Sequence, residues 1–330
     1  MRLTWRRVDV TIPPAGGVGH RTIWRAGALI TLSDGGYEGR GEASPLPGFS
    51  LETLSQVCEV LIKCKGEAPV EVPPSLPSLA FALEAARLDL QGRTRGVPVW
   101  RMLGGTSGSG LGLSRVLTGA TPDEVEGQAR HAVAKGFAAV KLKLDGADLD
   151  EGLARAAAAR RGAPSLRLRL DFNRSLPDAD LPRLAALAPL DPEFVEEPCM
   201  SGALAIDHSP VPIAADESLL EPGADEALDK ALRTGRLAAV VLKPALLGGL
   251  TRCVELAARA AKLGVPSVVT HLHDGPVARA AAAALALAIP NTAPAGLDTY
   301  AGFERWPIAP TAFAGPTRLA HAPAPGLGFA

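Results

Sequence analysis

The chain has 330 residues, of which 47% are hydrophobic and 21% are charged, and its formal net charge at pH 7 is −1. This balance excludes a disordered chain, and at this length it predicts one large barrel with an added lobe, or two domains. The sequence also has no basic stripe, which excludes the positively charged surface that nucleic-acid-binding proteins carry.

Nothing in the sequence predicts export or membrane insertion. The N-terminal stretch MRLTWRRVDVTIPP lacks the apolar core of a signal peptide, and the Ala-rich run 277–289 is too short to span a bilayer. The four cysteines are too scattered for a disulfide framework or a zinc site; they are Cys58, Cys64, Cys199 and Cys253. We therefore expect a cytoplasmic protein, monomeric or homo-oligomeric, with no nucleic-acid or membrane partner.

The first part of the chain has the pattern of a small α+β lobe. The stretches LTWRRVDVTI, RAGALITLSD and GYEGRGEASP indicate antiparallel strands, and residues 51–64 and 77–92 indicate helices. We assign residues 1–95 to an α+β capping domain, joined by the C-terminal segment 301–330.

From residue 111 onward, strand-like stretches alternate with Ala- and Leu-rich helical stretches. The strand-like stretches are LGLSRVL, AAVKLKL, SLRLRLDF, EFVEEP, PIAADES, LAAVVLKP, SVVTHLH and APAGLDT. Helical stretches such as 121–135, 250–263 and 275–288 separate most of them, although the link between the fourth and fifth is short. The pattern predicts an α/β protein with a (β/α)7β-type TIM barrel over residues 96–300.

Polar residues lie at the carboxyl ends of the predicted strands. In chain order they are Lys141, Lys143, Asp171, Asn173, Glu196, Glu197, Asp216, Glu217, Lys243, His271, His273, Asp274 and Asp298. A TIM barrel gathers these strand ends at one face, so the side chains can converge on one site. Carboxylates on adjacent strands repel one another without a hard cation among them, and oxygen ligands favour Mg²⁺. Taken alone, a lysine at a strand end can instead extend into solvent.

A set of motifs occurs together and in a fixed order. They are K-x-K at Lys141–Lys143, LDFN at Asp171, VEEPC at Glu196, ADES at Asp216 and LKP at Lys243. With these motifs the chain resembles the enolase superfamily, in its muconate-lactonizing branch, and within that branch the o-succinylbenzoate synthases. The stretch GEASPLPGFS, from residue 41, is similar to the capping lobe of those synthases, so the resemblance covers nearly the whole chain.

The resemblance implies a metal site. Asp171, Glu196 and Asp216 would hold Mg²⁺, with Mn²⁺ as a possible substitute, while Glu197 and Glu217 are the less favoured acids of their pairs. The metal would bind the substrate carboxylate and stabilise the enediolate that forms when the adjacent carbon loses its proton.

The resemblance also implies a set of catalytic lysines. Lys143 would be the base, and we expect the metal and neighbouring lysines, such as Lys141, to lower its pKa. Lys243 would face Lys143 across the site, where it would stabilise the developing anion or lie against the substrate ring.

Other residues are assigned to substrate binding or support. Arg169 lies on the same strand face as Asp171, and we expect it either to contact the substrate or to form a surface or inter-strand ion pair. Asn173 is expected to support the metal ligands. The paired Gly248 and Gly249 allow close backbone approach near the strand end, or they form a simple loop.

Two further features bear on the substrate. His271 and His273 lie on one strand face as a metal pair or as substrate contacts, at a place where the superfamily carries small hydroxyl residues. The loops around 15–22 and 45–50 resemble substrate-covering loops, although surface turns have a similar composition.

The expected reaction is the dehydration of 2-succinyl-6-hydroxy-2,4-cyclohexadiene-1-carboxylate to o-succinylbenzoate, a step of menaquinone biosynthesis with a small-molecule carboxylate as substrate. The alternative is an N-succinylamino acid racemase or a dipeptide epimerase on the same site. Dipeptide epimerases carry D-x-D at the eighth strand, whereas GLDTY holds only Asp298, which favours the synthase. A metal-free aldolase with Lys243 as Schiff-base lysine, or a non-enzymatic scaffold, would leave the three acids unexplained.

Overall fold

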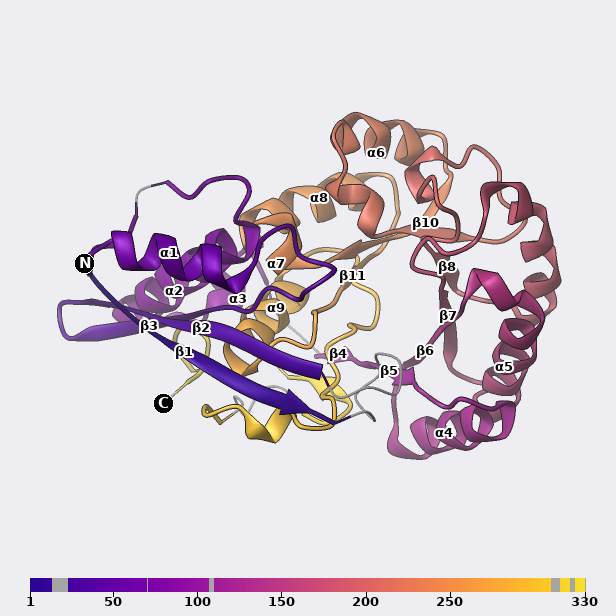
Figure 1. Ribbon diagram of the computed structural model, residues 1–330, viewed down its shortest axis with the longest axis horizontal. Coiled ribbons are helices and arrows are strands. Elements are labelled where there is room, and N and C mark those ends of the chain that lie inside the picture. Colours follow the sequence, from indigo (N-terminus) through magenta and orange to yellow (C-terminus); the bar gives the residue numbers. More distant parts are fainter. Residues whose placement is uncertain (14–22, 70, 107–109, 310–314, 321–323, 330) are drawn as a thin grey trace.

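The computed structural model describes residues 1–13, 23–69, 71–106, 110–309, 315–320 and 324–329. The predicted covering loop at 15–22 lies outside these residues. Figure 1 shows the N-terminal strands and both chain termini on one side of the molecule, and the strands and helices of a barrel on the other. Among the described residues, no helix is long and apolar enough to cross a bilayer.

A three-stranded antiparallel sheet forms the cap, as predicted. Its order is β1 (Arg2–Ile12), β2 (Ile23–Asp34) and β3 (Tyr37–Ala43), and helices α1 (Leu54–Lys63) and α2 (Pro77–Arg95) follow it. Alternate apolar residues of the strands, such as Ile30 and Leu32, pack against Leu79 and Leu83 of α2 in a core of their own. The division of the chain at residue 95 stays a prediction.

Seven parallel strands form the barrel wall, in the order β11–β10–β9–β8–β7–β6–β5. They are β5 (Ser114–Leu117), β6 (Ala139–Lys143), β7 (Arg167–Asp171), β8 (Phe194–Glu196), β9 (Ile213–Ala215), β10 (Leu237–Leu242) and β11 (Ser267–Val269). Residues 292–296 close the barrel, because the Ser114 N–H donates to Ala295 O at 2.8 Å and the Gly296 N–H donates to Val269 O at 2.9 Å. The predicted barrel is therefore confirmed, with an eighth segment that pairs through isolated bridges.

Helices surround the wall. They are α3 (Val99–Met102), α4 (Pro122–Lys135), α5 (Leu149–Gly162), α6 (Ala224–Arg233), α7 (Pro244–Leu247), α8 (Leu250–Lys262) and α9 (Pro276–Ala288), with 3-10 turns η2 (Gly146–Asp148), η4 (Ala203–Ala205), η5 (Glu217–Leu220) and η6 (Phe303–Arg305). The crossover from β7 to β8 is a long 3-10 stretch, η3 (Asp178–Leu190), with Pro182 and Pro189 inside it. Proline lacks the N–H that an α-helix needs, which accounts for this departure from α-helical geometry.

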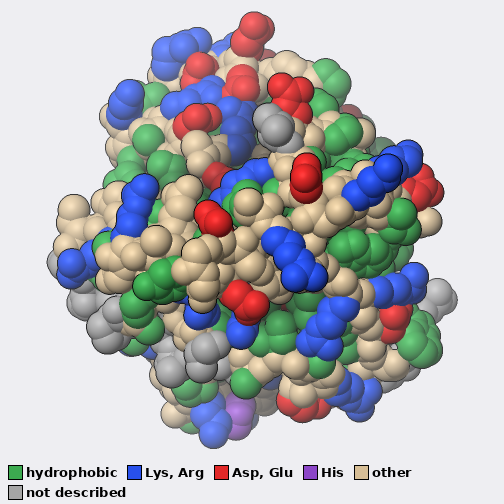
Figure 2. Space-filling view, turned by 90° about the vertical axis from the view of Figure 1, so that its left-hand side faces the viewer, with side chains coloured by type: hydrophobic (Ala, Val, Ile, Leu, Met, Phe, Trp, Pro, Cys, Tyr) green, Lys and Arg blue, Asp and Glu red, His purple; other side chains and the backbone are tan. Residues whose placement is uncertain are grey.

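The C-terminal segment returns to the cap. Strand β12 (Arg318–Leu319) pairs with β4 (Leu111–Gly112), and the Leu327 N–H donates to Asp89 of α2 at 2.7 Å. On the face shown in Figure 2, Lys and Arg side chains are interspersed with Asp and Glu side chains. This mixture agrees with the near-neutral net charge.

Candidate active site

Strand register brings the predicted residues to one end of the barrel. Lys143 on β6 pairs with Asp171 on β7, and Asp171 pairs with Glu196 on β8. Asp216 directly follows β9, and Lys243 directly follows β10. Because in-register residues on neighbouring strands project to the same side, their side chains share the interior of the carboxyl end.

The carboxylates at this end are buried and lie against ammonium groups. Asp171, Glu196 and Asp216 are only 1%, 2% and 3% exposed. The Lys141 Nζ lies 2.7 Å from Glu196 Oε1 and 2.9 Å from Asp171 Oδ2, and the ammonium of Lys243 contacts the carboxylate of Asp216. Buried carboxylates are expensive without such cations, so the lysines are needed for the site to fold.

The two lysines of the K-x-K motif differ electrostatically. Burial, and after it the charges of Lys141 and Lys243, lowers the pKa of Lys143. Burial also acts to lower the pKa of Lys141, but the carboxylates of Asp171 and Glu196 outweigh it and raise that pKa. Lys143 is thus the lysine of this pair suited to exchange a proton, with burial as the largest cause and the expected cationic neighbours Lys141 and Lys243 contributing in the same direction.

The acids fit a hard divalent cation. Their donor set is all oxygen and comes from successive strands, which is the chemistry that Mg²⁺ and Mn²⁺ take in proteins. Burial, and also the carboxylates of Glu217 and Glu196, raises the pKa of Asp216, while Lys243 opposes the rise. As the described side chains are placed, no three acidic, imidazole or thiol groups lie close enough together to hold a metal ion. Lysine ammonium groups lie against Asp171 and Asp216 instead.

Glu197, the second acid of its pair, organises the backbone. Glu197 accepts hydrogen bonds from the backbone N–H groups of Asp216 and Ser218 at 2.7 and 2.8 Å, and from Ala203 at 2.9 Å. Both of its oxygens are therefore occupied in holding the Asp216 turn. Glu197 was the less favoured ligand of its pair, and its structural role could not be predicted because its partners come from the separate segments at Ala203 and Asp216.

Asn173 links two acids of the site. Its backbone N–H donates to Asp171 Oδ1 at 2.9 Å, and its Nδ2 donates to Glu217 Oε1 at 2.9 Å. The other Glu217 oxygen is buried without a hydrogen-bond partner in the described part of the chain. Asn173 thus holds Asp171 in place, as a residue that supports a metal ligand must.

Arg169 forms an inter-strand ion pair. It is 2% exposed, its Nε lies 2.5 Å from Glu193 Oε2, and its Nη1 donates to Pro294 O at 2.7 Å. The guanidinium also lies 5.1 Å from the ring centre of Phe194 inside the barrel. Arg169 therefore joins β7 to the closing segment, in agreement with the second of its two predicted roles.

The paired glycines face the cap. A Cβ at Gly249, where φ is 152°, would lie 2.2 Å from Glu84 Oε2 of helix α2. Glu84 in turn accepts the Thr251 N–H at 3.0 Å at the start of α8. The predicted close approach exists at Gly249, where the partner is a cap carboxylate, whereas Gly248 ends helix α7 in the left-handed conformation and has no close contact at its Cβ position among the described residues.

The metal-pair interpretation of the histidines is wrong for His271. Its Nδ1 accepts the Asp274 N–H at 3.2 Å, so its Nε2 carries the proton and donates to Asp298 O at 3.1 Å. Burial, and next the charge of His273, lowers the pKa of His271 to about 3. A neutral ring with both nitrogens in use has no lone pair left for a metal. His271 and His273 instead lie 6.0 and 5.0 Å from the ring of Tyr300.

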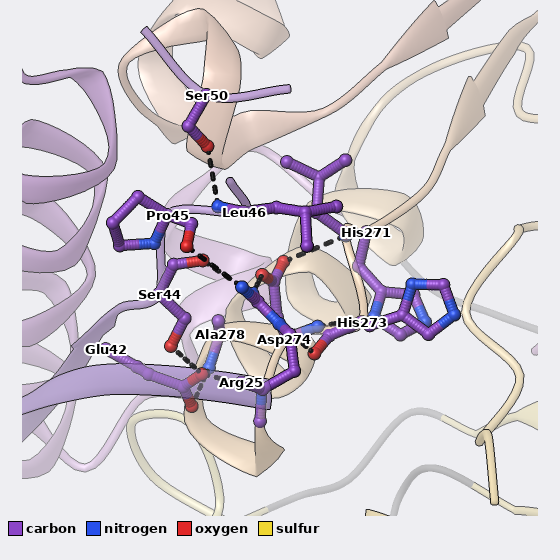
Figure 3. Close-up of polar contacts among 12 residues, drawn as sticks. Arg25, Glu42, Ser44, Pro45, Leu46, Ser50, His271, His273, Asp274 and Ala278 are labelled. Atoms are coloured by element: carbon purple, nitrogen blue, oxygen red, sulfur yellow. Dashed lines mark hydrogen bonds and ion pairs between the residues drawn. The ribbon is translucent and has the colours of Figure 1, made fainter. Parts of the chain in front are cut away.

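The loop at 45–50 lies over the site. The ring centre of Phe49 is 5.8 Å from Lys143 Nζ, and Leu46 packs with Leu246 and Leu272 at the carboxyl end of the barrel. The predicted covering loop therefore lies beside Lys143. Figure 3 shows what holds it, a cluster around Arg25 and Glu42 that the sequence analysis missed. Arg25, a charged residue inside the largely apolar strand β2, was the available signal, whereas Glu42 lies among other charged residues of β3.

Comparisons with known proteins agree with this geometry. Residues 124–330 match the family described as "Enolase C-terminal domain-like", and residues 18–90 match "MenC, N-terminal domain". The fold is similar to that of a dipeptide epimerase from Methylococcus capsulatus complexed with Mg and the dipeptide L-Arg-D-Lys, at 26% identity and a TM-score of 0.85 over 99% of each chain. It is also similar to an N-succinyl Arg/Lys racemase from Bacillus cereus, at 19% identity and a TM-score of 0.82 over 100% of this chain and 95% of that one.

Curated relatives point to one branch. The o-succinylbenzoate synthase of Edwardsiella ictaluri is 32% identical over 296 residues, which cover 83% of this chain and 82% of the relative. That of Haemophilus influenzae is 31% identical over 308 residues, which cover 87% of this chain and 88% of the relative. With a barrel that carries the superfamily's acids and lysines in register, the chain belongs to the o-succinylbenzoate synthase family of the enolase superfamily.

Proposed function

We propose that the chain is a carbon–oxygen lyase that dehydrates 2-succinyl-6-hydroxy-2,4-cyclohexadiene-1-carboxylate to o-succinylbenzoate. The observation that carries this proposal is the in-register row of Lys143, Asp171 and Glu196, with Lys243 two strands beyond Glu196. The row occurs in a chain whose curated relatives are o-succinylbenzoate synthases. The matches cover 82% and 88% of the length of those two relatives.

The proton transfers are assigned to Lys143. Its Nζ takes the proton from the ring carbon beside the carboxylate, and the electron pair of that C–H bond is delocalised onto the carboxylate until it forms the ring π bond as the hydroxyl leaves. The C–O bond to the ring hydroxyl then breaks, and the same Nζ returns its proton to the departing oxygen, which leaves as water. One lysine can serve both steps because both groups leave from one face, and the aromatic ring that forms drives the elimination.

Lys243 and Lys141 hold positive charge around the reacting carboxylate. Asp171, Glu196 and Asp216 are proposed to hold Mg²⁺, with Mn²⁺ as a substitute, and such a cation stabilises the negative charge of the substrate carboxylate while the neighbouring C–H bond breaks. Lys243 would remain a cation on the side opposite Lys143, beside the anion or the ring. Phe49 would exclude water above the base.

Racemisation of N-succinylamino acids is the second candidate. It requires a lysine on each face of the reacting carbon, and the strand order places Lys143 and Lys243 on either side of the acids. Against a dipeptide epimerase, Asp298 is the only acid in GLDTY, and its carboxylate accepts from Arg115 at 2.6 Å.

One preparation should be assayed for both reactions, by the loss of diene absorbance and by the optical rotation of an N-succinylamino acid. We expect efficient dehydration in the presence of Mg²⁺. Efficient racemisation with negligible dehydration would overturn the proposed lyase activity.

A further inference from the structure

A buried polar cluster joins the cap to the barrel beside the loop at 45–50. It consists of Arg25 on β2, Glu42 on β3 and Asp274 in the turn after β11. These side chains are at most 3% exposed, although each carries an ionisable group. Figure 3 shows them converging between the end of β3 and the start of α9.

Arg25 connects two loops with one guanidinium. On the cap side, its Nη1 and Nη2 donate to Pro45 O at 2.9 Å and to Ser44 O at 2.5 Å. On the barrel side, its Nε donates to His273 O at 3.1 Å and its Nη2 lies 3.3 Å from Asp274 Oδ1. The planar fork of an arginine suits this task because several donors have fixed directions.

Glu42 caps a barrel helix from the cap domain. It accepts the N–H groups of Gly275, Val277 and Ala278 at 2.6, 3.1 and 3.2 Å, which are buried donors at the start of α9 that have no acceptor within the helix. A Cβ at Gly275 would lie 2.7 Å from Glu42 Oε2, so a side chain there would displace the carboxylate. The contact fixes the end of β3 against the loop that follows β11.

The clamped backbone leads directly into the loop over the site. Ser44 and Pro45 are held by Arg25, Leu46 packs on Leu246 and Leu272, and Phe49 reaches Lys143. After the loop, Glu52 accepts the Ser78 N–H at 2.6 Å. Both ends of the loop are thus fixed, and the end nearer the barrel is fixed by Arg25, Glu42 and Asp274.

We propose that Arg25, Glu42 and Asp274 are positioning residues that hold loop 44–50 over the substrate site and thereby set substrate affinity. Among the described residues, their side-chain hydrogen bonds and ion pairs are with the cap strands, loop 44–50, the turn before α9 and the start of that helix, and none is with Lys143, Lys243 or the acids. Weakening the cluster therefore raises KM and leaves kcat nearly unchanged. The expected rise in KM rests on the proposed dehydration. The statement that the cluster holds loop 44–50 in place does not depend on that reaction.

The test compares Asp274→Asn and Glu42→Gln, which keep side-chain size, with Asp89→Asn as a matched control. Asp89 is also a buried cap carboxylate, and it accepts the N–H groups of Arg40 and Leu327 at 2.8 and 2.7 Å, away from loop 44–50. Arg25→Lys serves as the milder variant, because it keeps the charge and loses the fork. Each variant is measured for Tm, for KM and kcat of dehydration, and for hydrogen–deuterium exchange of the peptide over residues 44–53.

In Asp274→Asn and Glu42→Gln we expect KM to rise about tenfold with kcat within about twofold of wild type, and faster exchange in 44–53. Arg25→Lys should show the same pattern to a smaller degree, and Asp89→Asn should lower Tm without either change. Unaltered exchange in 44–53 in every cluster variant, or an equal rise of KM in Asp89→Asn, would overturn the inference. If the wild type does not dehydrate the diene, the proposed function fails, and the exchange measurement alone decides whether the cluster holds the loop.

Discussion

The active end of the barrel and the cap–barrel cluster both bury charges, but they satisfy them differently. At the active end, Asp216 lies near two other carboxylates, and one Glu217 oxygen has no hydrogen-bond partner among the described residues. In the cluster, every nitrogen of Arg25 donates, and both oxygens of Glu42 accept. Buried carboxylates that lie close to one another are typical of a binding site. Buried charged groups whose donors and acceptors are all hydrogen-bonded are typical of a structural contact between domains.

The largest expected effect comes from the crowded acids. Asp171→Asn, Glu196→Gln and Asp216→Asn should each reduce dehydration to background, because each removes a charge proposed to hold the metal. The unfolding free energy should stay equal or rise in Asp216→Asn, because burial and the neighbouring carboxylates disfavour the charge of Asp216, and it should fall in Asp171→Asn, which removes a buried carboxylate partner of Lys141. Activity assays together with urea unfolding would check both parts, and retained turnover in all three variants would remove these acids from the mechanism.

The lysines should differ in their consequence. We expect Lys143→Ala to abolish exchange of the substrate's α-proton with deuterated solvent, and Lys243→Arg to keep a small residue of dehydration because a cation remains. Mass spectrometry of recovered substrate measures the exchange. Wild-type exchange in Lys143→Ala would show that another group is the base.

The fully paired cluster should behave in the opposite way to Asp216. Arg25→Met leaves the Asp274 carboxylate buried without its cation, so we expect a loss of about 3–5 kcal/mol in unfolding free energy. Urea unfolding measures this loss. If Arg25→Met proved as stable as Asp216→Asn, the contrast between the two regions would disappear.

A smaller effect should appear in the pH dependence of stability. Burial, and after it Asp274, raises the pKa of Glu42 to about 7 from an ordinary 4.5; Arg25 and Tyr300 are the other ionisable groups near it. The folded state binds this proton more tightly than the unfolded state, so the associated stability is complete below about pH 4.5 and is lost as the pH rises through about 7. The loss is on the order of 3 kcal/mol.

Unfolding of wild type and Glu42→Gln at pH 5 and pH 8 would measure this dependence. We expect the fall in unfolding free energy from pH 5 to pH 8 to be smaller in Glu42→Gln, where Asp274 is the acid of the cluster that still has a pKa raised by burial. Equal falls in the two proteins would show that Glu42 does not titrate in this range.

Sequence alone predicted the barrel and its row of charges. A charged residue at the end of an apolar run has few places to lie in a parallel barrel, so Lys143, Asp171, Glu196 and Lys243 were found from pattern, motif and order. The roles of His271 and Arg169 were not decided in this way. They depend on which backbone carbonyls and N–H groups lie nearby, and those groups come from distant segments such as Pro294 and Asp298.

The cap–barrel cluster was missed for a related reason. Arg25 and Glu42 lie in strands that were correctly predicted, but their partners are in the turn after β11, more than 200 positions away in the chain. Neither residue belongs to a motif with a spacing of its own. Only the docking of cap on barrel reveals that their burial is compensated.

Asp171, Glu196 and Asp216 are proposed to form a divalent metal site that supports dehydration by Lys143. The most direct measurement follows diene loss on one sample in Mg²⁺, after excess chelator, and after Mg²⁺ is restored. We expect full activity, then no activity, then recovery, with the far-ultraviolet circular dichroism unchanged throughout. Full activity in excess chelator would contradict the account.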